Sequence, residues 1–399
     1  MKISNRVNKM QYSAIRALVP LAEKAKSKGI KVNHLNVGVP DFKTPAIFLD
    51  RIKAFEADRI VYANAKGLRE LRIAISDFYK DKYNLDYPID SIAITSGASE
   101  ALKFTLMAIT DYGDKVLTAD PYYSNYKSYF DKSGISLNTF ATCFKENFSL
   151  PSKEEIESKI DDKTKAILIC NPDNPTGKVY TKTELTMLTE IAKENDLYII
   201  GDEIYRDFVY NDQEFTSLGE FSKVRDNVIL IDSISKRFSA CGARIGAVLS
   251  KNAEFMEAIF KLCTARLAVA TIEQYGAVGL YQLRDDYVKQ VREDYQVRAD
   301  LASNLLKKIE GIKVTKPEGA FYIMVKLPVS DSNDFSSWLL TDFNYQGETV
   351  MVAPASGFYQ ANKQGNSEIR IAFAVDVQVL IKGIDLLERG LIAYKKHLN

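Results

Sequence analysis

The sequence contains few of the residues on which many catalytic mechanisms and metal sites depend. Only two of the 399 residues are histidines, His34 and His397, so mechanisms that need a catalytic histidine are poorly supported. The four cysteines lie far apart and have no partner at the spacing of a metal site. We therefore expect reduced thiols in a cytoplasmic protein and no bound metal ion.

An excess of one charge and a long apolar run are also absent. Lysine and arginine number 53 against 52 for aspartate and glutamate, so a basic surface that binds nucleic acid is not expected. No apolar run approaches the roughly 18 residues of a membrane span, and the first residues lack the apolar stretch of a signal peptide. With 46% hydrophobic residues, the chain can instead build a sizeable core, divided over about two or three domains.

Short apolar runs alternate with helical patterns through the middle of the chain. Several of these runs are apolar on both faces, as expected of strands buried between two layers of helices. Segments with helical spacing, such as Ser99–Thr110 and Glu184–Glu194, separate some of them, which indicates βαβ units and a mostly parallel sheet. The predicted strands are Ser91–Thr95, Lys115–Ala119, Lys165–Cys170, Leu197–Gly201, Val228–Ile231 and Ile245–Leu249.

The two ends of the chain have a different pattern. Ser4–Lys28 has helical spacing, and a long helical pattern, broken or kinked, follows Glu273 before strands and helices mix toward the C-terminus. The sequence therefore predicts an α/β protein with two domains. The larger, 46–285, has a mostly parallel sheet between helix layers, and the smaller α+β domain consists of 1–45 and 286–399.

Two loops that follow predicted strands contain small and rigid residues. In the first, Gly97, Ala98 and Ser99 lie where a strand ends and a helix begins, and free N–H groups at such a helix start favour a phosphate. An ordinary turn with a serine cap explains the same residues, and the dinucleotide fingerprint G-x-G-x-x-G is absent. In the second, two Asn-Pro steps around Asn174 form a rigid loop where ligands gather in open α/β sheets, although a plain turn is the alternative.

Ionisable residues follow two further strands. Asp202 and Glu203 come directly after an apolar strand, where a partly buried carboxylate stays ionised only beside a cation or good donors. For Glu203, a solvated turn or a helix N-cap is the better interpretation. Lys236 follows the strand that ends at Ile231, and Arg244 lies eight positions later. A lysine is usually a surface charge, but a desolvated one has a lowered pKa and can act as a nucleophile or Schiff-base former.

Together these segments provide a phosphate loop, a rigid asparagine loop, an acid near a tyrosine, and a lysine near an arginine. The motifs N-P-x-N-P-T-G, D-E-I-Y, S-x-S-K and R-I-G occur in this order, and with 36–42 and 367–370 the match runs nearly end to end. In these motifs the sequence resembles the fold-type I pyridoxal-phosphate (PLP) aminotransferases of class I and II. The resemblance implies that fold, PLP as the cofactor, and transfer of an amino group from an amino acid to a 2-oxo acid such as 2-oxoglutarate.

The resemblance assigns roles to residues of these motifs. Lys236 would form the Schiff base with PLP and, once freed, move the substrate's α-proton as a general acid and base. Asp202 would face the pyridine nitrogen and keep it protonated, which makes the ring an electron sink. Asn174 and Tyr205 would hydrogen-bond the ring's 3′-oxygen, and Tyr123 would stack on the ring. Tyr126, by contrast, is interpreted as a packing residue.

Further ligands of the cofactor and the substrate follow from the same resemblance. Arg370 would bind the substrate's α-carboxylate as a bidentate pair, helped by Gly38 and Asn174. Tyr62 would reach the phosphate of a partner subunit, which implies a homodimer with shared active sites. The implied phosphate ligands within the subunit are Gly97, Ala98, Ser99, Ser233, Ser235 and Arg244.

The choice of amino acid depends on where a further cation lies. One branch of the family uses a lysine directly after the glycines of the phosphate loop to bind a side-chain carboxylate, and Ser99 occupies that place here. Another branch uses an arginine of the partner subunit, and Arg266 lies near that position, judged by its distance along the chain from Lys236. Aspartate is the best prediction, with another dicarboxylic, a neutral or an aromatic amino acid as alternatives. A solvated helix end is the other interpretation of Arg266.

Other functions are compatible with the same fold and lysine. A PLP-dependent carbon–sulfur β-lyase, or a cyclopropane-type synthase, would keep the cofactor and change the reaction, because a fold does not determine function. A third possibility is a PLP-binding protein without catalytic activity. The complete set of Asp202, Lys236 and Arg370 argues against this third function.

Overall fold

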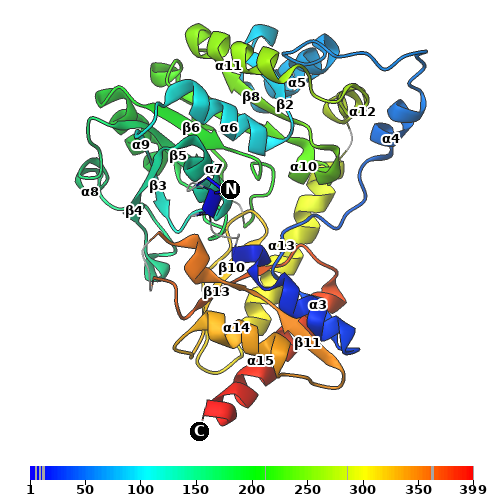
Figure 1. The fold of residues 1–399 in the computed structure, drawn as a ribbon, viewed down its shortest axis with the longest axis vertical. Helices are drawn as coiled ribbons and strands as arrows, with labels where there is room; N and C mark the ends of the chain where they lie inside the picture. The colour runs from blue at the N-terminus through cyan, green and yellow to red at the C-terminus, as the bar shows by residue number, and fades with distance from the viewer. Residues whose placement is uncertain are drawn as a thin grey trace.

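The computed structural model describes residues 1–4, 7, 8, 10, 14–211, 213–284, 286–360 and 364–398. Over these residues the chain forms two units (Figure 1). A large sheet with its covering helices occupies the upper part of the view, and the smaller sheets with the C-terminal helices occupy the lower part. No helix in the described ranges has the length and apolar character needed to cross a membrane.

A seven-stranded sheet forms the centre of the larger unit. Its strands are β2 (Ile92–Thr95), β3 (Lys115–Asp120), β4 (Ser136–Ala141), β5 (Thr164–Cys170), β6 (Tyr198–Asp202), β7 (Val228–Ser233) and β8 (Gly246–Ser250). They are ordered β2-β8-β7-β6-β5-β3-β4, and only β8 runs antiparallel to its neighbours in this sheet. The carboxyl ends of the parallel strands therefore meet at one edge, where open α/β sheets bind ligands.

Helices cover both faces of this sheet, which explains its nearly continuous apolar strands. Because successive side chains of a strand point to opposite faces, Ile199 and Leu230 belong to one core and Ile200 and Ile229 to another. The first core includes residues of α5 (Arg69–Tyr83), α9 (Lys182–Glu194) and α12 (Thr271–Tyr281). The second includes residues of α6 (Ala98–Ile109), α7 (Asn125–Ser133) and α11 (Ala253–Arg266).

The smaller unit combines segments from both ends of the chain. An antiparallel sheet has the order β12 (Ala353–Pro354), β13 (Glu368–Ala372), β10 (Tyr322–Lys326) and β9 (Lys313–Val314). N-terminal strand β1 (Lys31–His34) pairs with C-terminal strand β11 (Glu348–Met351) in a second, two-stranded parallel sheet. The longer helices of this unit are α3 (Val19–Ser27), α13 (Tyr287–Leu306), α14 (Ser332–Thr341) and α15 (Val377–Leu398).

The predicted elements agree with this architecture in most places. All six strands predicted for the middle of the chain are confirmed to within two residues at each end, whereas β4 of the same sheet has no counterpart among the predictions. The segment 4–28, predicted to be helical, contains two separate helices in its described part, α2 (Ala14–Ala17) and α3. Its residues 5, 6, 9 and 11–13 lie outside the described residues. The domain limits 46–285, 1–45 and 286–399 stay a prediction.

Candidate active site

A cavity of about 540 Å³ lies at the carboxyl edge of the large sheet, within the 300–1,000 Å³ range of small-molecule sites. Residues of both units line it. It gathers most of the predicted site residues, although these are far apart in the sequence. The predicted residues in its lining are Gly38, Ala98, Ser99, Tyr123, Asn174, Asp202, Tyr205, Ser233, Ser235, Lys236, Arg244 and Arg370.

Lys236 lies on α10 (Ile234–Arg237), a single turn that follows β7 directly. Ser233 begins this turn, because its Oγ accepts a hydrogen bond from the backbone N–H of Ser235 at 3.1 Å. The Lys236 Nζ donates to the carbonyl oxygen of Gly38 at 2.6 Å. Burial lowers the pKa of Lys236 to about 8, and the positive charges of Arg370 and Arg244 act in the same direction. The amine can therefore lose its proton near neutral pH.

Asp202 ends β6 and is 5% exposed. Its Oδ2 accepts a hydrogen bond from the Tyr126 hydroxyl at 2.7 Å, whereas Oδ1 is buried without a hydrogen-bond partner in the described structure. Burial raises the pKa of Asp202 to about 6, and the Tyr126 hydroxyl and the nearby backbone N–H of Ile204 oppose this rise. A buried oxygen of this kind is suited to a donor supplied by a ligand.

Arg370 lies on β13, fully buried, and none of the described carboxylates forms an ion pair with it. Its Nη1 donates to Asn174 Oδ1 at 2.8 Å and its Nη2 donates to the carbonyl of Asn36 at 2.6 Å, whereas its Nε has no partner among the described residues. The guanidinium also lies over the ring of Tyr322, 4.2 Å from the ring centroid. Burial lowers the pKa of Arg370. Because an unpaired buried charge is costly, this guanidinium is prepared for an anionic ligand.

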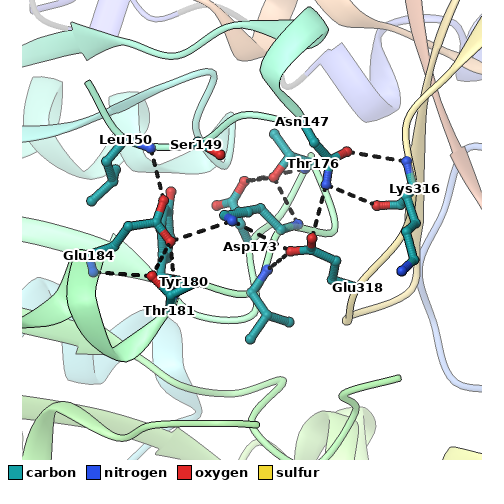
Figure 2. Close-up of polar contacts among 12 residues, drawn as sticks. Asn147, Ser149, Leu150, Asp173, Thr176, Tyr180, Thr181, Glu184, Lys316 and Glu318 are labelled. Carbon is teal, nitrogen blue, oxygen red and sulfur yellow. Dashed lines mark hydrogen bonds and ion pairs between the residues drawn. The ribbon is translucent and has the colours of Figure 1, made fainter. Parts of the chain in front are cut away.

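Polar contacts of residues that do not line the cavity fix the loop that carries Asn174 (Figure 2). The Asp173 carboxylate accepts a hydrogen bond from the Thr176 hydroxyl at 2.6 Å, and Glu318 accepts from the backbone N–H of Val179 at 3.0 Å. Lys178 lies between two carboxylates, 3.4 Å from Glu184 and 3.7 Å from Glu318. These contacts hold the loop in one conformation and so orient the Asn174 amide toward Arg370.

The N-terminus of α6 and Arg244 also line the cavity. Gly97 precedes this helix with a φ of 73°, and a Cβ at this position would lie 2.5 Å from Nη2 of Arg244. Glycine therefore allows the guanidinium to pack against the start of the helix. The first N–H groups of the helix, the Ser99 hydroxyl and Arg244 are the donor set that a phosphate dianion needs.

Three predicted residues, Gly97, Tyr62 and Arg266, are absent from the lining of the cavity, although Gly97 directly precedes Ala98, which does line it. Tyr62 is 80% exposed on the protomer surface. The Arg266 guanidinium donates to Glu100 Oε2 at 3.2 Å and to the carbonyls of Ala65 and Ile94 at 3.1 and 3.3 Å. Its donors are thus largely engaged within its own protomer. The roles of Tyr62 and Arg266 at a partner subunit's site stay predictions.

One interpretation from the sequence is wrong, and another is incomplete. Glu203 does not lie in a solvated turn; its buried carboxylate accepts hydrogen bonds from Ser217 Oγ at 2.8 Å and the N–H of Leu218 at 2.9 Å, and pairs with Arg206 at 3.2 Å. Tyr126 is more than a packing residue, because it donates to Asp202. Its position in the sequence carries no signal for this, although buried tyrosine hydroxyls usually find a partner.

The residues present fit PLP, the cofactor implied by the resemblance. The partnerless Oδ1 of Asp202 suits a protonated ring nitrogen, and the donors around Arg244 and the start of α6 suit a phosphate. Lys236, with its lowered pKa, lies in the same cavity and can react with an aldehyde. Asn174 and Tyr205 supply polar atoms for the ring's remaining oxygen.

Comparisons with known proteins agree with this site. The family model described as aminotransferase class I and II matches residues 30–385. An aspartate aminotransferase of Bacillus sp. (strain YM-2) is 32% identical over 397 residues, covering 97% of this chain and 98% of that protein. A (5-formylfuran-3-yl)methyl phosphate transaminase of Methanocaldococcus jannaschii is 33% identical over 392 residues, covering 98% of this chain and 99% of that protein.

A solved structure extends the likeness to three dimensions. An alanine aminotransferase from Pyrococcus furiosus superposes with a TM-score of 0.90 at 32% identity, and the match covers 98% of this chain and 100% of that one. The match therefore spans both units of the molecule. This chain belongs to the class I and II aminotransferases.

Proposed function

We propose that this PLP-dependent aminotransferase uses aspartate or another dicarboxylic amino acid as donor and a 2-oxo acid such as 2-oxoglutarate as acceptor. The observation that carries the proposal is Arg370, a buried cation without a described carboxylate partner that faces the same cavity as Lys236 and Asp202. A relative named for aspartate supports the dicarboxylic donor, whereas the neighbour named for alanine makes a neutral amino acid the second candidate.

Each residue of the cavity has a task in this proposal. When bound, PLP supplies an electron-withdrawing ring that stabilises the charge developing at the substrate's α-carbon. Lys236 accepts the α-proton at Nζ and returns it, which its pKa of about 8 allows near neutrality. Asp202 keeps a proton on the ring nitrogen through Oδ1, and Arg370 orients the substrate by holding its α-carboxylate.

The remaining cofactor contacts follow from the same cavity. Arg244 and the serines at 99, 233 and 235 bind the phosphate together with the N–H groups at the start of α6. Tyr123 stacks on the ring, and Tyr205 and Asn174 bind its oxygen. We also propose a homodimer in which Tyr62 reaches the partner's phosphate, and a cytoplasmic location, which the four free cysteines support.

A panel of amino acids tests this function directly. The purified holoenzyme is mixed with each amino acid, and conversion of bound PLP to the pyridoxamine form is followed by absorbance. We expect aspartate or glutamate to react fastest, and the Lys236→Ala variant to lose the visible absorbance and nearly all turnover. Release of ammonia and pyruvate from cysteine or cystathionine, without pyridoxamine formation, would instead identify a carbon–sulfur β-lyase.

A further inference from the structure

The cavity contains one more cation than the proposed reaction has so far used. Four cationic side chains line it, Arg16, Lys236, Arg244 and Arg370, and Asp202 is the one carboxylate among the described lining residues. In the proposed reaction Lys236 transfers the α-proton, Arg244 binds the phosphate and Arg370 binds the α-carboxylate. Arg16 remains without a function in this scheme.

Arg16 also has no partner among the residues that the structure describes. It lies on α2, it is exposed, and none of the described residues accepts a hydrogen bond from it or forms an ion pair with it. Arg370, in contrast, is oriented by Asn174 and the carbonyl of Asn36. An unneutralised guanidinium at the edge of a ligand cavity presents a planar fork that matches a carboxylate.

The fold carries Arg16 and Arg370 on the same unit. Helix α2 packs against β12 and against the short helix η6 (Ala355–Phe358). Strand β12 pairs with β13, with Ala353 opposite Arg370. The two arginines are therefore held by neighbouring elements of the smaller unit, and their separation does not depend on how this unit sits against the larger one. Both arginines line the same cavity, so a ligand bound there meets two cations of the smaller unit.

Other residues are less suited than Arg16 to bind a side-chain carboxylate. Ser99 supplies a hydroxyl and no positive charge at the start of α6. Arg266 has three hydrogen bonds within its own protomer, including one to Glu100, and does not line the cavity. A carboxylate that bound Arg266 would compete with Glu100, whereas Arg16 has no such competitor among the described residues.

We propose that Arg16 binds the side-chain carboxylate of the substrate within the same protomer and so selects dicarboxylic over monocarboxylic amino acids. This inference rests on the proposed function and names its specificity residue. Arg370 binds one carboxylate of the substrate and Arg16 the other, while Lys236 acts on the carbon between them.

The test compares Arg16→Ala and Arg16→Lys holoenzymes with the wild type, using aspartate, glutamate, alanine and phenylalanine. Because a charge-assisted pair is lost, Arg16→Ala should lower kcat/KM for the two dicarboxylic amino acids by at least about 10-fold. The values for alanine and phenylalanine should stay within about 2-fold. Arg16→Lys should recover part of the loss, because the charge remains but the planar fork does not.

A binding measurement gives a second readout that needs no turnover. Titration of the holoenzymes with maleate, a dicarboxylate, and crotonate, a monocarboxylate, should show a Kd that rises in Arg16→Ala for maleate alone. Lys24→Ala is the matched control, because it removes an exposed cation of α3 that does not line the cavity. It should change neither Kd.

Different outcomes would overturn different statements. A wild type that reacts with alanine or phenylalanine as fast as with aspartate and glutamate contradicts the proposed dicarboxylic donor. An unchanged Kd for maleate in Arg16→Ala, or equal losses for all four amino acids, contradicts the role of Arg16. A dicarboxylate-selective loss in Arg266→Ala but not in Arg16→Ala would assign this role to the partner subunit's arginine.

Discussion

At the scale of single residues, two buried groups with incomplete partners define the site. Arg370 is a cation without a described anion, and Asp202 keeps one oxygen without a hydrogen bond. Both states cost free energy in the protein alone, because buried polar groups are normally paired. Both groups face one cavity, so a ligand with a carboxylate and a protonated ring nitrogen would remove both costs together.

The Tyr126 hydroxyl controls the charge of Asp202, which leads to a pH prediction. Its hydrogen bond stabilises the carboxylate against burial, so Tyr126→Phe should raise the pKa of Asp202 above about 6. Asp202 is charged above its pKa and neutral below it. As the pH is lowered, the affinity of the apoenzyme for PLP should therefore begin to fall at a higher pH in Tyr126→Phe than in the wild type. Equilibrium titrations with PLP from pH 5 to 8 measure this shift.

The neighbouring tyrosine provides the control for that experiment. Tyr122 is also buried, but it does not line the cavity and its hydroxyl has no described hydrogen bond to Asp202. Tyr122→Phe should leave the pH profile of PLP binding unchanged. Identical profiles for the wild type and Tyr126→Phe would show that the Tyr126 hydroxyl does not control the charge of Asp202.

At the scale of elements, the loop between β5 and α9 joins the two units of the molecule. Gly177 has a φ of 71°, and a Cβ there would lie 2.6 Å from the backbone oxygen of Tyr322 on β10. Gly177→Ala should therefore combine backbone strain with a backbone clash, and destabilise the protein by about 2–5 kcal/mol. It should also lower kcat/KM, because Asn174 would move away from Arg370.

The variant Gly113→Ala tests backbone strain in the absence of a steric clash. Gly113 also has a positive φ, 92°, but a Cβ there would meet nothing within 4 Å. This variant should lose only about 1–2 kcal/mol and keep its activity. Thermal unfolding and steady-state kinetics of both variants measure the difference, and equal losses in the two would contradict the packing argument for Gly177.

The same elements show what a sequence can predict. Strands such as β6 and β7 are apolar on both faces, so their positions follow from the residues alone, and the motifs around Asn174 and Lys236 indicate the family and its PLP-transferase fold, which the comparisons confirm. The partners of Tyr126 and Glu203 could not be foreseen. They depend on contacts between residues 76 and 14 positions apart, which local patterns do not encode.

At the scale of the whole molecule, the proposed cofactor contacts and the proposed substrate contacts lie on different units. The cofactor ligands lie on the large sheet and its helices, whereas Arg370 and Arg16 lie on the smaller unit. Substrate binding therefore connects the units, and the mutual position of Lys236 and Arg370 depends on the interface between them. The loop anchored by Glu318 and Lys178 is one place where that interface is built from specific polar contacts.

The proposed homodimer leads to a prediction that can be tested with mixed dimers of two variants. If Tyr62 serves the partner's cavity, Lys236→Ala in one subunit and Tyr62→Ala in the other both damage the same cavity of a mixed dimer. One cavity then lacks Lys236, but the other has its own Lys236 and an intact Tyr62 from its partner. Refolding equal amounts of the two variants together should therefore restore about one quarter of the wild-type activity, because half of the dimers are mixed and each has one complete site.

The mass and the PLP affinity of the Tyr62→Ala variant and of the mixture show whether a shared active site explains such a recovery. Tyr62→Ala alone should remain a dimer of the 44.9 kDa chain with weakened PLP binding, because an 80% exposed side chain contributes little to the fold of its own protomer. Light scattering checks the mass, and PLP titration checks the affinity. A dimeric mixture with no recovery, or a fully active Tyr62→Ala dimer, would mean that each cavity binds its phosphate without the partner's tyrosine.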